Sequence, residues 1–240
     1  MLLLDIGNSR IKWAQAEGGR VLRQGAAGIS EWLALQQTFA TLPQPHKILV
    51  SNVAGEEAAQ QVRAVCAEWR CPLEFISARQ EQCGVLNTYD KPEQLGSDRW
   101  AALIAAWHHE RAACLVVSCG TATTIDTLSD KGEFLGGLIL PGMEMMRCAL
   151  AAGTAQLRPG EGSWREFPRN TADAMTSGAI QATVGAIRCQ YELLGTRGAR
   201  CLLSGGAVDD VQTHLGLPLL KMDNMVLQGL QIIGQESFQR

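Results

Sequence analysis

Residues 1–12 read MLLLDIGNSRIK, and this stretch decides the fold. Residues 2–4 form a short apolar run that ends on the carboxylate of Asp5. The Gly-Asn-Ser sequence that follows favours a tight turn, and an apolar segment resumes at Ile11. A second turn is predicted at Gly18-Gly19, before another apolar pair. The opening therefore predicts a meander of three strands, with Asp5 at the mouth of its first turn.

The first predicted turn carries groups suited to binding an anion. A turn that contains glycine can bring backbone N–H groups close to an anion, and Asn8, Ser9 and Lys12 add side-chain donors. The carboxylate of Asp5 cannot bind phosphate directly, but it can hold a hydrated magnesium ion beside one. These residues alone leave a second interpretation open, in which an ordinary buried strand precedes a polar hairpin.

A second copy of this plan decides between the two interpretations. Residues 114–128 read CLVVSCGTATTIDTL, which is an apolar run, a turn at Gly120-Thr121 and an extended Thr/Ile segment, and a further turn follows at 130–132. An internal repeat of this size predicts a duplicated domain, and we divide the chain into residues 1–110 and 111–240. Two phosphate-binding turns that face each other across a cleft suit a nucleoside triphosphate.

Composition predicts a well-packed chain without a nucleic-acid partner or a membrane span. Of 240 residues, 46% are apolar and 19% are charged, which is ample material for a core. The net charge of −3 comes without any basic tract that would offset the phosphates of a nucleic acid. Asp5 interrupts the first apolar run and no basic leader precedes it, so no signal peptide is expected. No apolar stretch is long enough to span a bilayer, and we expect a cytoplasmic protein.

The eight cysteines are single, with no Cys-x-x-Cys pair among them. We expect them to be reduced and mostly buried, as small apolar side chains. His108 and His109 fall in a predicted helix without ligand partners at metal spacing. The sequence therefore predicts no zinc site, and these histidines are interpreted as surface or packing residues.

A four-residue segment, Gly96-Ser97-Asp98-Arg99, leads into a predicted helix whose alanine-rich part is residues 100–109. This places Asp98 in the first helical turn, where the helix dipole would keep its carboxylate ionised. An ionised carboxylate suits a proton acceptor, and a favourable first-turn carboxylate without a catalytic role is the alternative. Arg99 can equally be a solvated surface cation. The strands and helices before this segment alternate, which predicts an α/β domain.

The second half contains further turns and helices. Pro141-Gly142 feeds a helix predicted over residues 143–150. Residues 153–169 are predicted as an irregular excursion, and Asn170-Thr171 cap a long helix over residues 172–194. The alanines and glycines of that helix allow the close approach of a twin in a dimer, or of a neighbour within the monomer.

A glycine turn follows the strand predicted near the end of the chain. Residues 201–207 read CLLSGGA, and bare backbone at Gly205-Gly206 leaves room for a flat group such as a purine. Because Gly-Gly is common in loops, this feature alone does not identify a nucleotide site.

Together, these motifs resemble the type III pantothenate kinases, within the superfamily of sugar kinases, heat-shock chaperones and actin. The resemblance covers nearly the whole chain. It rests on the order and spacing of residues 5–12, Gly96–Arg99, Gly120–Ala122, Gly136-Gly137 with Pro141-Gly142, Asn170-Thr171 and Ser204–Ala207. It implies an α/β fold of two duplicated ribonuclease H-like (actin-like ATPase) domains with a nucleotide cleft between them. It also implies a homodimer that uses ATP to phosphorylate pantothenate to 4′-phosphopantothenate, the first step of coenzyme A biosynthesis.

The resemblance also implies roles for individual residues. The ATP-binding residues would be Asp5, Ile6, Gly7, Asn8, Ser9, Arg10, Ile11, Lys12, Gly120, Thr121, Gly205 and Gly206, with a magnesium ion held at Asp5 through water. The pantothenate-binding residues would be Tyr89, Gly96, Ser97, Asp98, Arg99 and Thr171. Asp98 would be the base that accepts the proton of the primary hydroxyl, and Thr171 would reach in from the neighbouring protomer.

One residue departs from the family pattern. The family usually has an aspartate at the position of Ser118, where it is linked to a monovalent cation, potassium or ammonium. Ser118 supplies a neutral oxygen instead of a charge. A cation site here would therefore have to be rebuilt, for instance with backbone carbonyls, and Asp126 is nearby in the sequence.

Other classes of function compete with the kinase. A non-catalytic nucleotide-binding regulator, like the Bvg accessory factors among the relatives, could use the same fold. The intact Gly96–Arg99 segment favours an enzyme, because a regulator has no need of a base beside a second-substrate pocket. A sugar kinase of the same superfamily is a further alternative, whereas the chain is short for an actin-like filament protein. A Rossmann dehydrogenase is excluded because no G-x-G-x-x-G follows the first strand.

Overall fold

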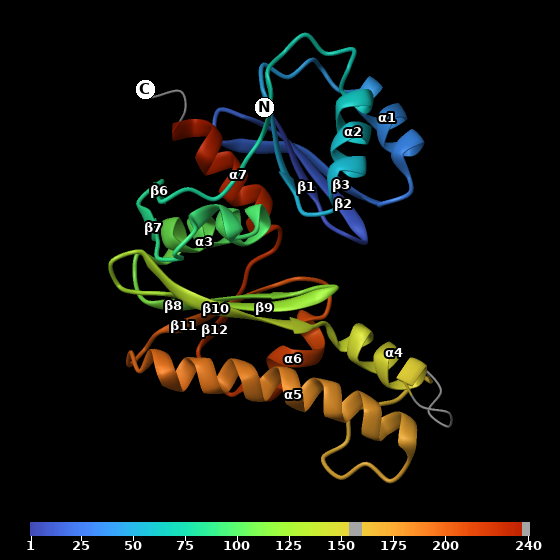
Figure 1. Ribbon diagram of the computed structural model, residues 1–240, viewed down its shortest axis with the longest axis vertical. Helices are drawn as coiled ribbons and strands as arrows, with labels where there is room; N and C mark the ends of the chain where they lie inside the picture. Colours follow the sequence, from blue (N-terminus) through green and yellow to red (C-terminus); the bar gives the residue numbers. More distant parts are fainter. Residues whose placement is uncertain (154–159, 237–240) are drawn as a thin grey trace. The chain divides into compact units, whose positions relative to one another are not determined.

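A computed structural model describes residues 1–153 and 160–236 (Figure 1). The chain folds into two compact units. Unit 1 is made of Met1–His109 together with the chain from Asn224 onward, and unit 2 is made of Glu110–Asp223. Within the described residues, no helix combines the length and the apolar character needed to cross a membrane.

Unit 1 is built on a five-stranded sheet in the order β3-β2-β1-β4-β5. The strands are β1 (Leu2–Ile6), β2 (Arg10–Glu17), β3 (Arg20–Gly28), β4 (Ile48–Asn52) and β5 (Leu73–Phe75). The first three form the predicted antiparallel meander, and β4 and β5 run parallel to β1. Two helices make the crossovers, α1 (Trp32–Ala40) and α2 (Glu56–Val65).

The two faces of this sheet are covered by different helices. Leu2, Leu4 and Ile6 alternate along β1 and pack into a core with Phe39 of α1. The opposite face is covered by α7 (Met225–Glu236), so that α1 and α2 lie on one side and α7 on the other (Figure 1). Fully burying a leucine side chain stabilises a fold by about 1.5–3 kcal/mol, so the buried apolar residues of β1 contribute substantially to the stability of unit 1.

The segment that joins β5 to the next long helix is more ordered than predicted. The sequence indicates an irregular stretch over residues 78–97, whereas the structure forms a hairpin of β6 (Glu81–Gln82) and β7 (Val85–Asn87). Cys83 and Gly84 both have positive φ, 53° and 77°, as a two-residue hairpin turn requires. A short 3-10 helix, η1 (Pro92–Gln94), and then α3 (Ser97–Glu110) follow.

Unit 2 repeats the strand plan of unit 1. Its strands lie in the order β10-β9-β8-β11-β12, with an antiparallel meander followed by two parallel strands. They are β8 (Cys114–Cys119), β9 (Ala122–Leu128), β10 (Glu133–Pro141), β11 (Arg200–Ser204) and β12 (Leu219–Lys221). The helices are α4 (Met143–Gly153), α5 (Thr171–Leu194) and α6 (Val208–Leu215), and α5 runs along one face of the sheet (Figure 1).

In each copy, the glycine of the first turn donates a backbone hydrogen bond to the strand that follows. The N–H of Gly7 donates to the carbonyl of Arg10 at 3.0 Å, and the N–H of Gly120 donates to the carbonyl of Ala122 at 3.0 Å. Strand register matches as well, because Asp5 pairs with Ser51 across β1 and β4 as Ser118 pairs with Ser204 across β8 and β11. Ser118 is thus the counterpart of Asp5 in the second copy.

Helix α7 and residues 153–169 bear on two of the predicted boundaries. The predicted second domain, 111–240, includes α7, but the structure places α7 in unit 1, where Gly229 and Gly234 allow it to pack closely on α3 and on the sheet. Of the predicted excursion over 153–169, residues 154–159 lie outside the described residues. The part from 160 to 169 has no helix or strand. It lies alongside α5, because the N–H of Arg165 donates to Ser177 Oγ at 2.9 Å.

Candidate functional site

The first predicted phosphate turn joins β1 to β2 at the end of the central strand. Asn8, Ser9 and Arg10 are exposed at its tip, where their polar groups can reach a ligand. Ile6 and Ile11, which flank the turn, are wholly buried in the core. Of the predicted nucleotide-binding residues, these two can therefore offer only backbone groups.

Asp5 lies at the base of this turn with charged groups on either side. Strand register places Lys12 directly across β2 from Asp5, and Asp98 lies close enough for the two carboxylates to repel each other. The pKa of Asp5 is raised from 3.8 to about 7, mainly by burial, with the Lys12 ammonium lowering it and the Asp98 carboxylate raising it. The structure thus brings the predicted metal-binding residue and the predicted base to one place in unit 1.

This environment fits a hydrated magnesium ion. A half-buried carboxylate that is costly to ionise gains from a divalent cation beside it. No cluster of three or more His, Cys, Asp or Glu side chains suited to a metal occurs among the described residues. Magnesium commonly keeps several waters and takes only one or two protein carboxylates, so Asp5 is a sufficient anchor.

The raised pKa of Asp5 predicts a pH-dependent stability of the metal-free protein. The folded state keeps a proton on Asp5 that the unfolded chain has already released, so stability falls as pH rises from about 4 to about 7. The loss from this one group is at most about 4 kcal/mol. Asp5→Asn removes the titrating group, and denaturant unfolding at several pH values with a chelator present should give a flatter profile. Identical slopes for the two proteins would contradict the assignment.

Asp98 occupies the first turn of α3, as predicted. Its Oδ1 accepts a hydrogen bond from the N–H of Arg99 at 2.8 Å, which fixes the carboxylate over the start of the helix. A Cβ on Gly96 would lie 2.7 Å from that same oxygen. Glycine at 96 therefore leaves the space that this conformation of Asp98 requires.

Arg99 is buried and not a surface cation. Only 7% of its surface is exposed, and its Nη1 lies 3.4 Å from the hydroxyl of Tyr89 as a hydrogen-bond donor. The backbone N–H of Tyr89 donates to Oδ1 of Asn87, which is itself fully buried. The predicted pantothenate residues of unit 1, Tyr89 and Gly96–Arg99, thus lie together.

In unit 2, three glycine-containing turns converge at the end of β8. The N–H of Gly142 donates to the carbonyl of Thr121 at 2.9 Å, and a Cβ on Gly142 would lie 2.2 Å from the carbonyl oxygen of Gly120. A Cβ on Gly205 would lie 2.2 Å from the carbonyl oxygen of Cys119. The structure therefore brings the predicted phosphate turn at Gly120-Thr121 against the predicted adenosine turn at Gly205-Gly206.

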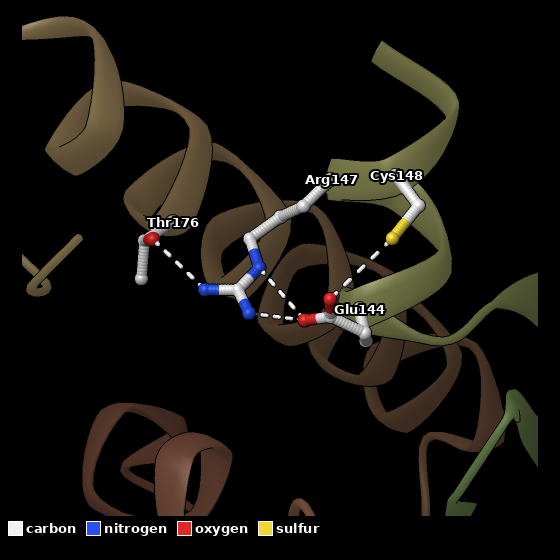
Figure 2. Close-up of polar contacts among 4 residues, drawn as sticks. All are labelled: Glu144, Arg147, Cys148 and Thr176. Atoms are coloured by element: carbon white, nitrogen blue, oxygen red, sulfur yellow. Dashed lines mark hydrogen bonds and ion pairs between the residues drawn. The ribbon is translucent and has the colours of Figure 1, made fainter. Parts of the chain in front are cut away.

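The helix that follows Gly142 is fastened to α5 (Figure 2). Arg147 of α4 donates to Thr176 of α5 at 3.4 Å and forms an ion pair with Glu144 one turn earlier. Cys148 donates through its Sγ to the second oxygen of Glu144 at 3.4 Å. These contacts hold α4, and with it the chain that leaves Gly142, on the long helix of unit 2.

The pantothenate role of Thr171 and the cation role of Ser118 were predicted on the basis of the resemblance alone. Thr171 is exposed at the start of α5, in unit 2, whereas the other predicted pantothenate residues belong to unit 1. The predicted cap is confirmed for Asn170, whose Oδ1 accepts a hydrogen bond from the N–H of Asp173, whereas Thr171 is the first residue of the helix.

Ser118 does not supply the charge expected at a monovalent-cation site. Its neighbours in register are Thr124 on β9 and Ser204 on β11, so hydroxyls surround a position where a carboxylate is expected. Asp126 shares this face of the sheet one pleat further along, but it is 1% exposed and already has an interaction of its own. The residues present do not fit a carboxylate-held potassium or ammonium ion.

Sequence reasoning missed two residues that hold this site. Ser51 on β4 lies across from Asp5, and Asn87 on β7 supports Tyr89. Their partners lie far along the chain or in a hairpin that was not predicted. A polar residue inside an otherwise apolar strand, as Ser51 is in ILVSN, is the one pattern that could have indicated a role.

Solved structures define the class of fold. A putative 2-dehydro-3-deoxygalactonokinase from Sinorhizobium meliloti matches with a TM-score of 0.58 at 15% identity, covering 99% of each chain. A conserved putative Baf family transcriptional activator from Campylobacter jejuni matches with a TM-score of 0.65 at 22% identity, covering 100% of each chain. The protein has the ribonuclease H-like, actin-like fold of the sugar kinases, as predicted.

Sequence relatives identify the family within that class. The family model of the type III pantothenate kinases matches residues 1–192. A type III pantothenate kinase from Nitrosospira multiformis is 44% identical over 240 residues, covering 99% of this chain and 92% of the relative. Another from Aromatoleum aromaticum is 46% identical over 237 residues and covers 98% of both chains. The chain belongs to the type III pantothenate kinase family, and the predicted resemblance is confirmed.

Proposed function

We propose that this protein transfers the γ-phosphoryl group of ATP to the primary hydroxyl of pantothenate. The product would be 4′-phosphopantothenate, at the first step of coenzyme A biosynthesis. The observation that carries the proposal is the placement of Asp98 beside Asp5, with the buried Arg99 and Tyr89 next to it. A base, a magnesium anchor and a cation suited to an anion would thus lie together in this member of a kinase family.

Phosphoryl transfer depends mainly on positioning and on neutralising charge, with little covalent chemistry for the protein to perform. Asp98 would orient the attacking hydroxyl and accept its proton at a carboxylate oxygen. Asp5 would hold magnesium through water, and the bound ion would neutralise charge on the phosphates. Lys12, directly across the strand pair from Asp5, would add a positive charge at the same place.

Arg99 and Tyr89 suit the carboxylate end of pantothenate. A guanidinium group presents several N–H donors in a plane that matches two carboxylate oxygens, and the Tyr89 hydroxyl can add a further hydrogen bond. Because Arg99 is largely buried, the local dielectric would be low once the substrate excludes water. The attraction between the Arg99 guanidinium and the substrate carboxylate would then be stronger than in water. Thr171 would complete the pocket from the neighbouring protomer of a cytoplasmic homodimer.

The glycine turns of unit 2 are also proposed to bind ATP. The Gly120-Thr121 turn would contact phosphate through its backbone N–H groups and the exposed hydroxyl of Thr121. The adjoining Gly205-Gly206 turn would lie against adenine, since it has no side chain to keep a flat ring away. The close backbone packing of these two turns supports a single ligand that spans both.

The test is an ADP-release assay with pantothenate and a panel of sugars as acceptors. Turnover with pantothenate at least about tenfold above every sugar would support the proposal, since a site built to bind a carboxylate discriminates strongly against neutral acceptors. Release of ADP only with a sugar would replace it with a sugar kinase. Nucleotide binding without turnover on any acceptor would favour the non-catalytic regulator.

The same assay tests the monovalent cation. Because Ser118 brings no carboxylate, we expect turnover with sodium or an organic cation alone to stay within about twofold of turnover in potassium or ammonium. In the matched variant Ser118→Asp, the new carboxylate should make turnover rise when potassium is added. A strict requirement for potassium or ammonium in the unchanged protein would show that other groups rebuild the site.

A further inference from the structure

Ser51 is a buried hydroxyl at the junction between the first phosphate turn and the helix that carries Asp98. It belongs to β4, whose other residues from Ile48 to Val50 are apolar and wholly buried. Ser51 itself has no exposed surface. A hydroxyl buried without a hydrogen bond costs about 1–3 kcal/mol, so a serine at this point requires a partner.

The partner lies at the start of α3. The Oγ atoms of Ser51 and Ser97 are 2.9 Å apart, and Ser97 is only 8% exposed. Ser97 is the first residue of α3, directly before Asp98. This hydrogen bond joins residues 46 positions apart, and it ties the first turn of the helix to the end of the strand.

Ser51 also lies beside Asp5, at the base of the first phosphate turn. Ser51 pairs in register with Asp5 on the neighbouring parallel strand, and residues paired in this way project to the same face of a sheet. Parallel strands lie about 4.8 Å apart, so Ser51 is next to Asp5 on one side and bonded to Ser97 on the other. A Cβ on Gly96 would lie 3.9 Å from Cγ1 of Val53, which confirms that the segment before Asp98 rests on this end of β4.

We propose that Ser51 is a positioning residue, which fixes the distance between the Asp98 carboxylate and the Asp5 turn through its hydrogen bond to Ser97. The inference rests on the proposed function, since the group that is positioned is the base of the kinase reaction. Ser51 does not touch the reacting atoms. Its effect passes through the first turn of α3, where Asp98 is held over Gly96.

Ser51→Ala removes the hydrogen bond with little change in volume. We expect kcat to fall about 10- to 100-fold, because a displacement of the order of 1 Å at a reacting group has effects of this size. KM for ATP should change by less than about twofold, since the exposed tip of the phosphate turn is untouched. Ser97→Ala should lower kcat similarly, and the double variant should be no worse than either single variant, as expected when two residues act through one contact.

A matched control removes a buried hydroxyl elsewhere. Thr183 on α5 is wholly buried and donates to the carbonyl of Ala179 at 3.0 Å, and Thr183→Val deletes this hydroxyl with nearly the same shape. Suppose that the two variants, Thr183→Val and Ser51→Ala, have the same melting temperature. If loss of stability alone lowers activity, their kcat values will then fall equally. That outcome would overturn the inference, as would strictly additive effects of Ser51→Ala and Ser97→Ala.

A second measurement needs no substrate. Hydrogen exchange of the peptide containing residues 96–101 reports the N–H of Trp100, which donates to the carbonyl of Gly96 at 3.0 Å. In Ser51→Ala we expect this peptide to exchange at least about fivefold faster, because the first turn of α3 loses its tether. Unchanged exchange together with unchanged kcat would refute the role of Ser51. The unchanged protein's turnover with pantothenate tests the proposed function separately, so the two failures can be told apart.

Discussion

Replacing Asp98 by asparagine is expected to lower kcat for pantothenate by roughly 10²–10⁴-fold, the range over which general-base catalysis contributes. The amide cannot accept the proton of the attacking hydroxyl. It can still accept the hydrogen bond from the N–H of Arg99 through Oδ1, so the start of α3 should keep its conformation. Because the predicted nucleotide contacts lie on other residues, KM for ATP should change by less than about twofold.

Steady-state kinetics with pantothenate and calorimetric titration with ATP measure the two quantities separately. Asp130→Asn is a matched control, since Asp130 is an exposed aspartate of unit 2 outside the proposed site. Near-normal turnover in Asp98→Asn would remove Asp98 as the base and leave its carboxylate a role in the helix alone. Loss of ATP binding in step with turnover would point instead to a damaged fold.

The sequence was sufficient to predict the parts of the fold that follow from local patterns. The apolar run of residues 2–4, the Gly-Asn-Ser turn and their second copy at residues 114–121 predict a duplicated α/β fold. Asp98 was placed correctly in the first turn of α3, because a helix start has a local signature. In each case the deciding residues are neighbours in the chain.

The sequence was insufficient where the deciding contact is distant. The hairpin of β6 and β7 escaped prediction because its strands are only two and three residues long. Arg99 is buried by partners that include Tyr89, which no periodic pattern links to it. The helix α7 follows the strands of unit 2 in the chain but packs in unit 1, and only its glycines, Gly229 and Gly234, hint at a close neighbour.

The repeat also explains why Ser118 is informative. In unit 1 a carboxylate and an ammonium group, Asp5 and Lys12, face each other across the first two strands. In unit 2 the same register brings Ser118 opposite Thr124, so both charges are replaced by hydroxyls. One copy is charged and the other is neutral, and a metal ion is therefore expected at Asp5 and not at Ser118.

The second large effect is expected at Gly205, which joins the two turns of unit 2. Its φ is +109°, a conformation that costs other residues about 1–3 kcal/mol. A Cβ would also lie 2.2 Å from the carbonyl oxygen of Cys119, which is backbone and cannot rotate away. Overpacking of this kind costs about 1–3 kcal/mol, so Gly205→Ala should destabilise the protein by roughly 2–6 kcal/mol and lower its melting temperature by at least about 4 °C.

The same substitution should weaken ATP binding by at least about tenfold, because it separates the two turns proposed to hold phosphate and adenine. The N–H of Ala207 donates to the carbonyl of Cys119 at 3.2 Å, and this bond is the first that the added methyl group would break. Gly206→Ala is the matched control for folding, since no atom lies within 4 Å of a Cβ there, and its melting temperature should stay within about 2 °C of the unchanged protein. Thermal unfolding and ATP titration of the two variants measure these effects. A Gly205→Ala protein with normal stability and normal ATP affinity would mean that the contact between Gly205 and Cys119 does not hold the nucleotide turn in place.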